Sequence, residues 1–218
     1  MNTNENFVIT ISRELGSGGR TVGRKLAAAL DVRYSDKELI GQLMKQFNLT
    51  ASGIEQLKGK KKNWIADFIT FVAPVPKVGM LVDTDSRYVQ EFRPDLTTDD
   101  LFKAETEILQ SIADEGSCVI AGRSGFFVLK DRPNKLDIFI TASPEHRIER
   151  VMRKQQLSRE EAEAAIERVD KARDNYVQRY TGMSRNDARN YDLCLNMDGL
   201  SEDDAVELIL SYIKYTAR

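Results

Sequence analysis

The chain is poor in the residues on which several classes of protein depend. Its 218 residues include two cysteines, one histidine and five prolines. A chain of this length can bury a sizeable core without disulfide bonds, so the cysteines need not pair. The single histidine, His146, has no cysteine or second histidine near it in the sequence. It therefore suggests neither a Cys/His catalytic pair nor a zinc site.

The sequence also lacks long hydrophobic runs and an excess of charge. Its most apolar stretch, 65–75, is interrupted by Asp67 and Pro74 and falls short of the about 18 apolar residues that a membrane-spanning helix needs. The 32 lysines and arginines nearly balance the 34 aspartates and glutamates, for a net charge of −2. Without a long apolar run we expect no membrane as a partner. We expect no nucleic acid either, because sequence-independent nucleic-acid binding usually requires a basic surface.

What is present is the composition of a globular protein, with 41% hydrophobic and 30% charged residues. Both cysteines lie in apolar runs, Cys118 in SCVIAG and Cys194 in DLCLN. We expect both to be small, buried core residues of a protein in a reducing compartment. The first ten residues lack the basic and apolar segments of a secretion signal, which predicts a cytoplasmic location.

Short apolar runs alternate with helical patterns along the chain. Five runs are expected to be strands: 7–12, 32–34, 117–121, 136–141 and 192–196. Six segments with helical spacing or capping residues are expected to be helices: 21–30, 35–47, 101–114, 143–154, 158–179 and 201–215. This alternation predicts an α/β fold with a parallel five-stranded sheet flanked by helices.

The sharpest motif is a glycine-rich loop between the first expected strand and the first helix. It reads Gly16, Ser17, Gly18, Gly19, Arg20 and Thr21. Glycines let backbone N–H groups turn toward a ligand, and a helix N-terminus attracts anions. The order strand, loop and helix is typical of a phosphate-binding P-loop, although a glycine turn without a ligand is the alternative.

Two positions depart from the P-loop pattern G-x-x-x-x-G-K-[ST]. Glu14 stands where the first glycine is expected, and Arg20 replaces the lysine. Arginine can still bring positive charge to phosphate oxygens, but its planar fork is bulkier than an ammonium group. We therefore expect the loop geometry to differ from that of an ordinary P-loop.

The second half of the chain is rich in arginine. Nine arginines fall between residues 147 and 189, among a similar number of acidic residues, and most of them are expected to be solvated helix positions. Arg147, Arg150 and Arg153 recur at a spacing of three, close to one helical face. Such a row can clamp a polyphosphate, because phosphoryl transfer requires positive charge around the transferring group.

Together these motifs resemble the cytidylate-kinase-like branch of the P-loop nucleoside monophosphate kinases. The matching segments are ISRELGSGGR at 11–20, DKELI at 36–40, the Gly-Arg pair at 122–123, the D-x-x-R pattern at 170–173 and YDLCLN at 191–196. The resemblance covers essentially the whole chain. It implies one P-loop kinase domain with its core at about 1–49, 115–145 and 190–218, a helical acceptor-side insert at about 50–114, and an arginine-rich lid with flanking helices at about 146–189.

The resemblance also implies roles for particular residues. The loop from Gly16 to Thr21 would hold the phosphates of ATP, and Thr21 would reach Mg²⁺ through the nucleotide. The catalytic candidates are Arg20, Arg150, Arg153 and Arg173. The acceptor candidates are Asp36, Arg123, Ser124, Arg168 and Asp170, where the register between Arg168 and Arg173 stays open. The partners would be small-molecule nucleotides.

One departure from the family bears on the acceptor. Cytidylate kinases usually read D-G-R-D where this chain reads Ala121, Gly122, Arg123 and Ser124. A hydroxyl thus replaces a carboxylate that could accept from an amino group of the base. CMP or dCMP is the first substrate to consider. A non-catalytic nucleotide-binding protein and a kinase for a different small acceptor are the alternatives, and the oligomeric state is open.

Overall fold

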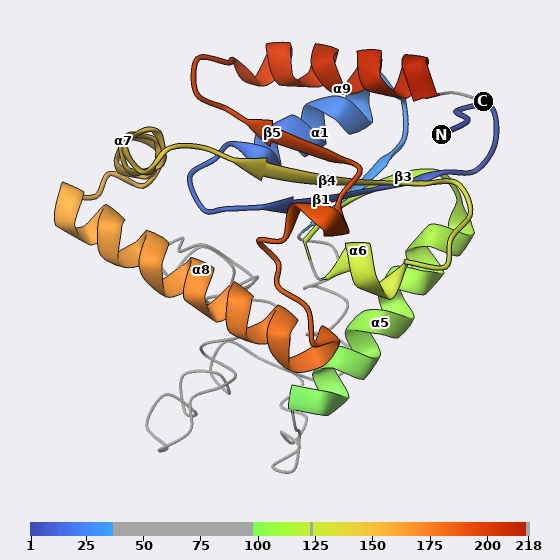
Figure 1. Ribbon diagram of the computed structural model, residues 1–218, viewed down its shortest axis with the longest axis horizontal. Helices are drawn as coiled ribbons and strands as arrows, with labels where there is room; N and C mark the ends of the chain where they lie inside the picture. Colours follow the sequence, from blue (N-terminus) through green and yellow to red (C-terminus); the bar gives the residue numbers. More distant parts are fainter. Residues whose placement is uncertain (37–97, 123, 217–218) are drawn as a thin grey trace, which may run out of the picture. The chain divides into compact units, whose positions relative to one another are not determined.

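The computed structural model describes residues 1–36, 98–122 and 124–216 (Figure 1). The chain divides into two units, one formed by Met1–Asp36 with Leu109–Arg218 and the other by Lys37–Ile108. The fold and the site presented below belong to the first unit. Residues 37–47 of the helix expected at 35–47, and residues 50–97 of the insert expected at 50–114, lie outside the described residues. Ser35, expected to begin that helix, is instead the last residue of a strand.

A parallel five-stranded sheet forms the centre of the first unit (Figure 1). Its strands are β1 (Val8–Arg13), β2 (Arg33–Ser35), β3 (Cys118–Ala121), β4 (Lys135–Thr141) and β5 (Leu193–Asn196). They follow the order β2-β3-β1-β4-β5, and all four pairings are parallel. The predicted fold class and all five predicted strands are confirmed. The strand order places β1, and the loop that follows it, in the middle of the sheet.

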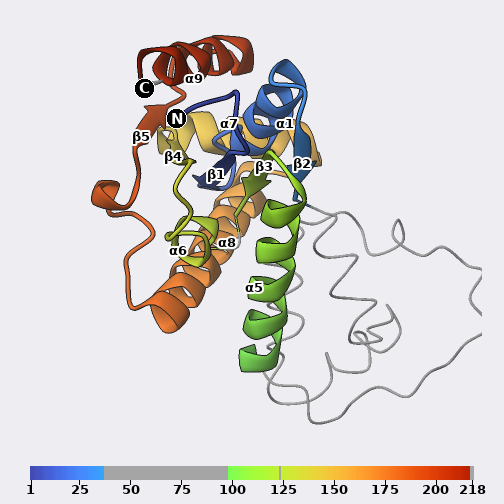
Figure 2. The same cartoon turned by 90° about the vertical axis from the view of Figure 1, so that its right-hand side faces the viewer.

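Helices cover both faces of the sheet (Figures 1 and 2). They are α1 (Gly19–Ala29), α6 (Gly125–Val128), α7 (Pro144–Gln155), α8 (Arg159–Thr181) and α9 (Glu202–Thr216), with a short 3₁₀ turn at Ala188–Asn190. A further helix, α5 (Thr98–Glu115), begins in the second unit and ends in the first. On one face, Ile9 and Ile11 of β1 share a buried cluster with Leu26 of α1 and Ile209 of α9. This core fixes α1 and α9 beside each other and sets the position at which α1 begins.

The capping residues explain why the helices begin where the sequence predicts. The Ser143 hydroxyl accepts from the His146 amide at 3.4 Å at the start of α7, with proline in the first turn. Ser158 and Glu161 form a capping box at the start of α8. Helix α8 ends at Gly182, whose φ of +68° is the left-handed conformation that terminates helices. The four-residue helix α6 has too little periodicity to be predicted.

The two cysteines lie in different environments. Cys118 is buried on β3, and burial raises its thiol pKa to about 11. Cys194 is exposed, so the prediction that both cysteines are core residues is wrong for this one. The reason is that β5 is an edge strand on which Leu193 and Leu195 turn toward the core while Cys194 points the other way. None of the helices in the described ranges is long and apolar enough to cross a membrane.

Candidate functional site

The glycine-rich loop joins β1 to α1 in a conformation that its glycines make accessible. Gly16 and Gly18 have φ of +87° and +86°, in the left-handed region that other residues avoid. A Cβ atom on Gly16 would also lie 2.6 Å from the carbonyl oxygen of Arg147. The turn therefore requires glycine at 16 for both its backbone angle and its close contact with α7.

The start of α1 presents unpaired amides. Thr21 and Val22 both donate to the Gly18 carbonyl, at 2.8 and 3.1 Å, and no side chain caps the helix. No described residue accepts from the amides of Gly18, Gly19 and Arg20. Uncapped amides at a helix N-terminus, with the positive end of the helix dipole behind them, are able to bind an anion such as a phosphate.

Arg150 of α7 faces this loop. Its Nη2 donates to the Thr21 hydroxyl at 3.2 Å, and its Nη1 pairs with Glu202 Oε1 at 2.7 Å. A Cβ atom on Gly18 would lie 3.5 Å from the guanidinium carbon. A cationic group is thus held against the loop, next to the amides that are available to an anion.

Arg20 points from the first turn of α1 toward the end of β2. Its Nε pairs with Asp36 Oδ2 at 2.5 Å, and Arg13 Nη2 donates to Asp36 Oδ1 at 3.3 Å. The Tyr34 hydroxyl donates to the Arg20 carbonyl at 3.2 Å, and burial, with a smaller contribution from Asp36, raises the pKa of this tyrosine to about 12. The residue at the position of the P-loop lysine is therefore held by a buried carboxylate.

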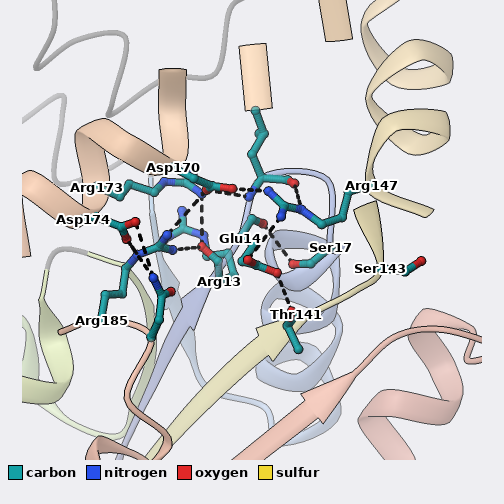
Figure 3. Close-up of polar contacts among 12 residues, drawn as sticks. Arg13, Glu14, Ser17, Thr141, Ser143, Arg147, Asp170, Arg173, Asp174 and Arg185 are labelled. Carbon is teal, nitrogen blue, oxygen red and sulfur yellow. Dashed lines mark hydrogen bonds and ion pairs between the residues drawn. The ribbon is translucent and has the colours of Figure 1, made fainter. Parts of the chain in front are cut away.

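Arg147 is buried behind the loop (Figure 3). Its Nε donates to the Leu15 carbonyl at 2.8 Å, Nη1 pairs with Glu14 Oε1 at 3.2 Å and Nη2 bonds Asp170. Asp170 also accepts from the Leu15 amide at 3.0 Å. Both backbone polar groups of Leu15 are thereby held by side chains from α7 and α8.

Two further arginines hold the end of β1. Nη1 of Arg173 and Nη1 of Arg185 both donate to the Arg13 carbonyl, at 3.1 and 2.8 Å, and both guanidinium groups also approach Asp170 (Figure 3). Burial, and then repulsion from Arg13, lowers the pKa of the Arg173 guanidinium. We call Arg147, Asp170, Arg173 and Arg185 the inner cluster. Its contacts fix the backbone from which the glycine-rich loop starts.

Glu14 has a structural role that the motif comparison missed. Its carboxylate accepts from the Thr141 hydroxyl at the end of β4 as well as pairing with Arg147 (Figure 3). The Glu14 amide donates to the Ile140 carbonyl at 3.1 Å. The residue that breaks the P-loop pattern thus joins the loop to the neighbouring strand and to α7.

The structure brings some of the predicted site residues together and leaves others apart. Gly16–Thr21, Arg20, Asp36 and Arg150 surround the start of α1, whereas Asp170 and Arg173 lie behind the loop in the inner cluster. Arg153 and Arg168 are exposed, and no described residue pairs with either. Arg123 lies outside the described residues.

The ends of β2 and β3 carry two buried hydroxyls with no hydrogen-bond partner among the described residues, those of Ser35 and Ser124. Ser124 has φ of +53°, which is unusual for a residue other than glycine, asparagine or aspartate. The sequence predicted a site role for Ser124 but not for Ser35, Arg185 or Glu202. Unpaired buried hydroxyls are costly, so they mark a position where a ligand could supply the missing partner.

The central glycine loop, the parallel sheet and the arginine-bearing helices define a P-loop kinase fold. A model of the cytidylate kinase-like family matches residues 8–199, and the chain belongs to this family. A comparison with curated protein sequences gives no match.

Solved structures share the fold at low sequence identity. An uncharacterized protein from Eubacterium ventriosum ATCC 27560 matches with a TM-score of 0.65 and 22% identity, over 95% of this chain and 98% of that one. Shikimate kinase from Acinetobacter baumannii, in complex with shikimate, matches with a TM-score of 0.52 and 16% identity, over 98% and 95% of the two chains. Shikimate kinase from Bacteroides thetaiotaomicron matches with a TM-score of 0.53 and 12% identity, over 95% of this chain and 98% of that one.

Proposed function

We propose that the protein transfers the γ-phosphoryl group of ATP, with Mg²⁺, to a nucleoside monophosphate, and that CMP and dCMP are the first acceptors to test. The observation that carries this proposal is the loop itself. Three amides without a described acceptor, two left-handed glycines and Arg150 converge at the start of α1. Membership of the cytidylate kinase-like family supports the same reading.

The residues at the loop fit a nucleotide that brings its own metal. The described part of the chain contains no group of three or more histidine, cysteine, aspartate or glutamate side chains that could hold a metal by itself. The Thr21 hydroxyl is a hard oxygen ligand of the kind Mg²⁺ prefers, and its oxygen keeps one acceptor position beside the bond from Arg150. When bound, the magnesium nucleotide supplies the phosphoryl group and neutralises part of its charge.

The chain's own residues would position this reaction and supply positive charge. The bond from the γ-phosphorus to the bridging oxygen breaks, a bond to an acceptor phosphate oxygen forms, and ADP leaves. Because the attacking oxygen is already anionic, no general base is required. Arg150 and Arg20 lie at the loop to stabilise the charge, and Arg153 would join them if the α7–α8 turn closes. Arg173 would act from behind the loop, through the backbone of Arg13.

The acceptor would bind where β2 and β3 end, because ligands of open α/β sheets bind at the carboxyl ends of the strands. Asp36, Ser35 and Ser124 lie at this edge, and the family resemblance makes Arg123, outside the described residues, a further acceptor candidate. Ser124 provides a hydroxyl in place of an acid. This difference is the specific observation that favours the second candidate, a kinase for a different small acceptor.

The deciding experiment incubates the purified protein with ATP, Mg²⁺ and one acceptor at a time, with ³¹P NMR to identify products. The panel contains CMP, dCMP, UMP, AMP, GMP and, because of the structural neighbours, shikimate. ADP together with CDP or dCDP supports the proposal. A phosphorylated product from shikimate, with none from any nucleotide in the panel, would favour the second candidate. ATP binding without any ADP would indicate a nucleotide-binding protein that does not catalyse transfer.

A further inference from the structure

Glu202 is an acidic residue far from the phosphate loop in sequence that meets the loop's arginine in space. It lies in the first turn of α9 and pairs through Oε1 with Nη1 of Arg150 at 2.7 Å. The other terminal nitrogen of the same guanidinium, Nη2, donates to the Thr21 hydroxyl at 3.2 Å. One terminal nitrogen of the guanidinium is therefore held by α9, and the other contacts the glycine-rich loop.

We propose that Glu202 is a positioning residue that holds Arg150 in its phosphate-facing orientation before the donor arrives. The inference rests on the proposed function, in which magnesium ATP binds at the loop. A free arginine side chain samples many rotamers, and ordering it upon binding costs free energy. A fixed carboxylate partner removes much of that cost in advance.

The surroundings of Glu202 distinguish this pair from an ordinary surface ion pair. The side chains of Arg150 and Glu202 are 13% and 28% exposed, whereas the neighbouring pair of Lys25 and Asp203 is 39% and 75% exposed. The interaction with Arg150 lowers the pKa of the Glu202 carboxyl against the opposing effect of its burial. Glu202 therefore stays ionised at neutral pH, as an anchor for a guanidinium must.

Helix α9 does not need Glu202 in order to begin. Its start is capped by Ser201 and Asp204, since the Asp204 amide donates to the Ser201 hydroxyl at 3.1 Å and the Ser201 amide donates back to Asp204 at 2.9 Å. Asp203 sits in the same turn and pairs with α1 at 2.7 Å. Asp203→Asn therefore removes an equivalent helix-end charge without touching Arg150, and serves as the matched control.

The test is a double-mutant cycle on affinity for magnesium ATP, measured by isothermal titration calorimetry on the full chain. Glu202→Gln is expected to weaken binding about two- to tenfold, the cost of re-ordering one long side chain. Glu202→Asp keeps the charge but has a shorter side chain, and it is expected to lose less affinity for magnesium ATP than Glu202→Gln. Asp203→Asn should stay within about twofold of the wild type. Glu202→Gln added to Arg150→Ala should cause no further loss, because the residue acts through the arginine.

Several results would overturn the inference. Unchanged or tighter binding by Glu202→Gln would mean that the carboxylate is neutral or competes with phosphate for Arg150. An equal loss in the presence and absence of Arg150 would assign Glu202 a general structural role. If Glu202→Gln does not fold, the same comparison is made with Glu202→Asp. A wild-type protein that does not bind magnesium ATP would instead reject the proposed function, and this inference with it.

Discussion

Arg147 and Arg150 lie one helical turn apart on α7 yet belong to two different regions. Arg147 is part of the inner cluster, where guanidinium groups donate to backbone carbonyls and share Asp170. Arg150 belongs to the loop face, where its guanidinium meets the Thr21 hydroxyl and lies beside Gly18. A row of arginines on one helix is thus divided between a buried framework group and a group that faces the glycine-rich loop. Burial and backbone contacts, rather than residue type, decide to which of the two groups an arginine belongs.

The largest expected effect separates the two regions by activity. Arg150→Ala should lower turnover on the order of 10³-fold, by analogy with arginines that stabilise a transferring phosphoryl group, while costing less stability than a change in the inner cluster. Steady-state kinetics with the acceptor identified from the panel, alongside thermal unfolding, measures both. A turnover close to the wild-type value in an active enzyme would show that Arg150 does not contact the transferring group.

Substitutions in the inner cluster should mainly lower the free energy of unfolding. Asp170→Ala leaves three guanidinium groups without their shared carboxylate and should lower the free energy of unfolding by about 3 kcal/mol. Glu163→Ala, which removes the exposed partner of Arg159 on the same helix, should cost no more than about 0.5 kcal/mol. Urea denaturation of both variants makes the comparison. Equal losses would mean that the inner cluster is no more than a solvated charge network.

Gly16→Ala tests the contact between the two regions. A left-handed alanine costs about 1–2 kcal/mol, and the close contact with the Arg147 carbonyl adds to that strain. Gly199→Ala is the control, because Gly199 has φ of +76° but no atom within 4 Å of its added Cβ. Urea denaturation of both should show the larger loss at Gly16. If the two variants lose the same stability, the approach of α7 to the loop is not a constraint.

The smallest effects are expected at the exposed arginines. Arg153→Ala and Arg168→Ala should each change the free energy of unfolding by less than about 0.5 kcal/mol, because no described residue pairs with them. A fall in turnover confined to Arg153→Ala would then report a contact made during catalysis. A marked loss of stability in either variant would place that arginine in the framework instead.

The elements that depend on local sequence could be predicted, and the contacts between distant elements could not. Strands, helix starts and the glycine loop follow from apolar runs, capping pairs and glycine spacing. The role of Glu14 could not be seen because its partners, Thr141 and Arg147, come from β4 and α7. Glu202 pairs with an arginine on another helix for the same reason. Cys194 was misjudged because an apolar run does not reveal which strand is at the edge of the sheet.

We propose that the amides at the start of α1 bind the donor phosphates while the inner cluster keeps the preceding backbone fixed. Titration of ¹⁵N-labelled protein with magnesium ATP, followed by amide NMR, tests both parts of this proposal in one experiment. We expect large shifts for the amides of Gly18, Gly19 and Arg20, and a smaller shift for the Leu15 amide, which already donates to Asp170 at 3.0 Å. Unshifted loop amides at saturating nucleotide, or shifts confined to another part of the chain, would contradict it.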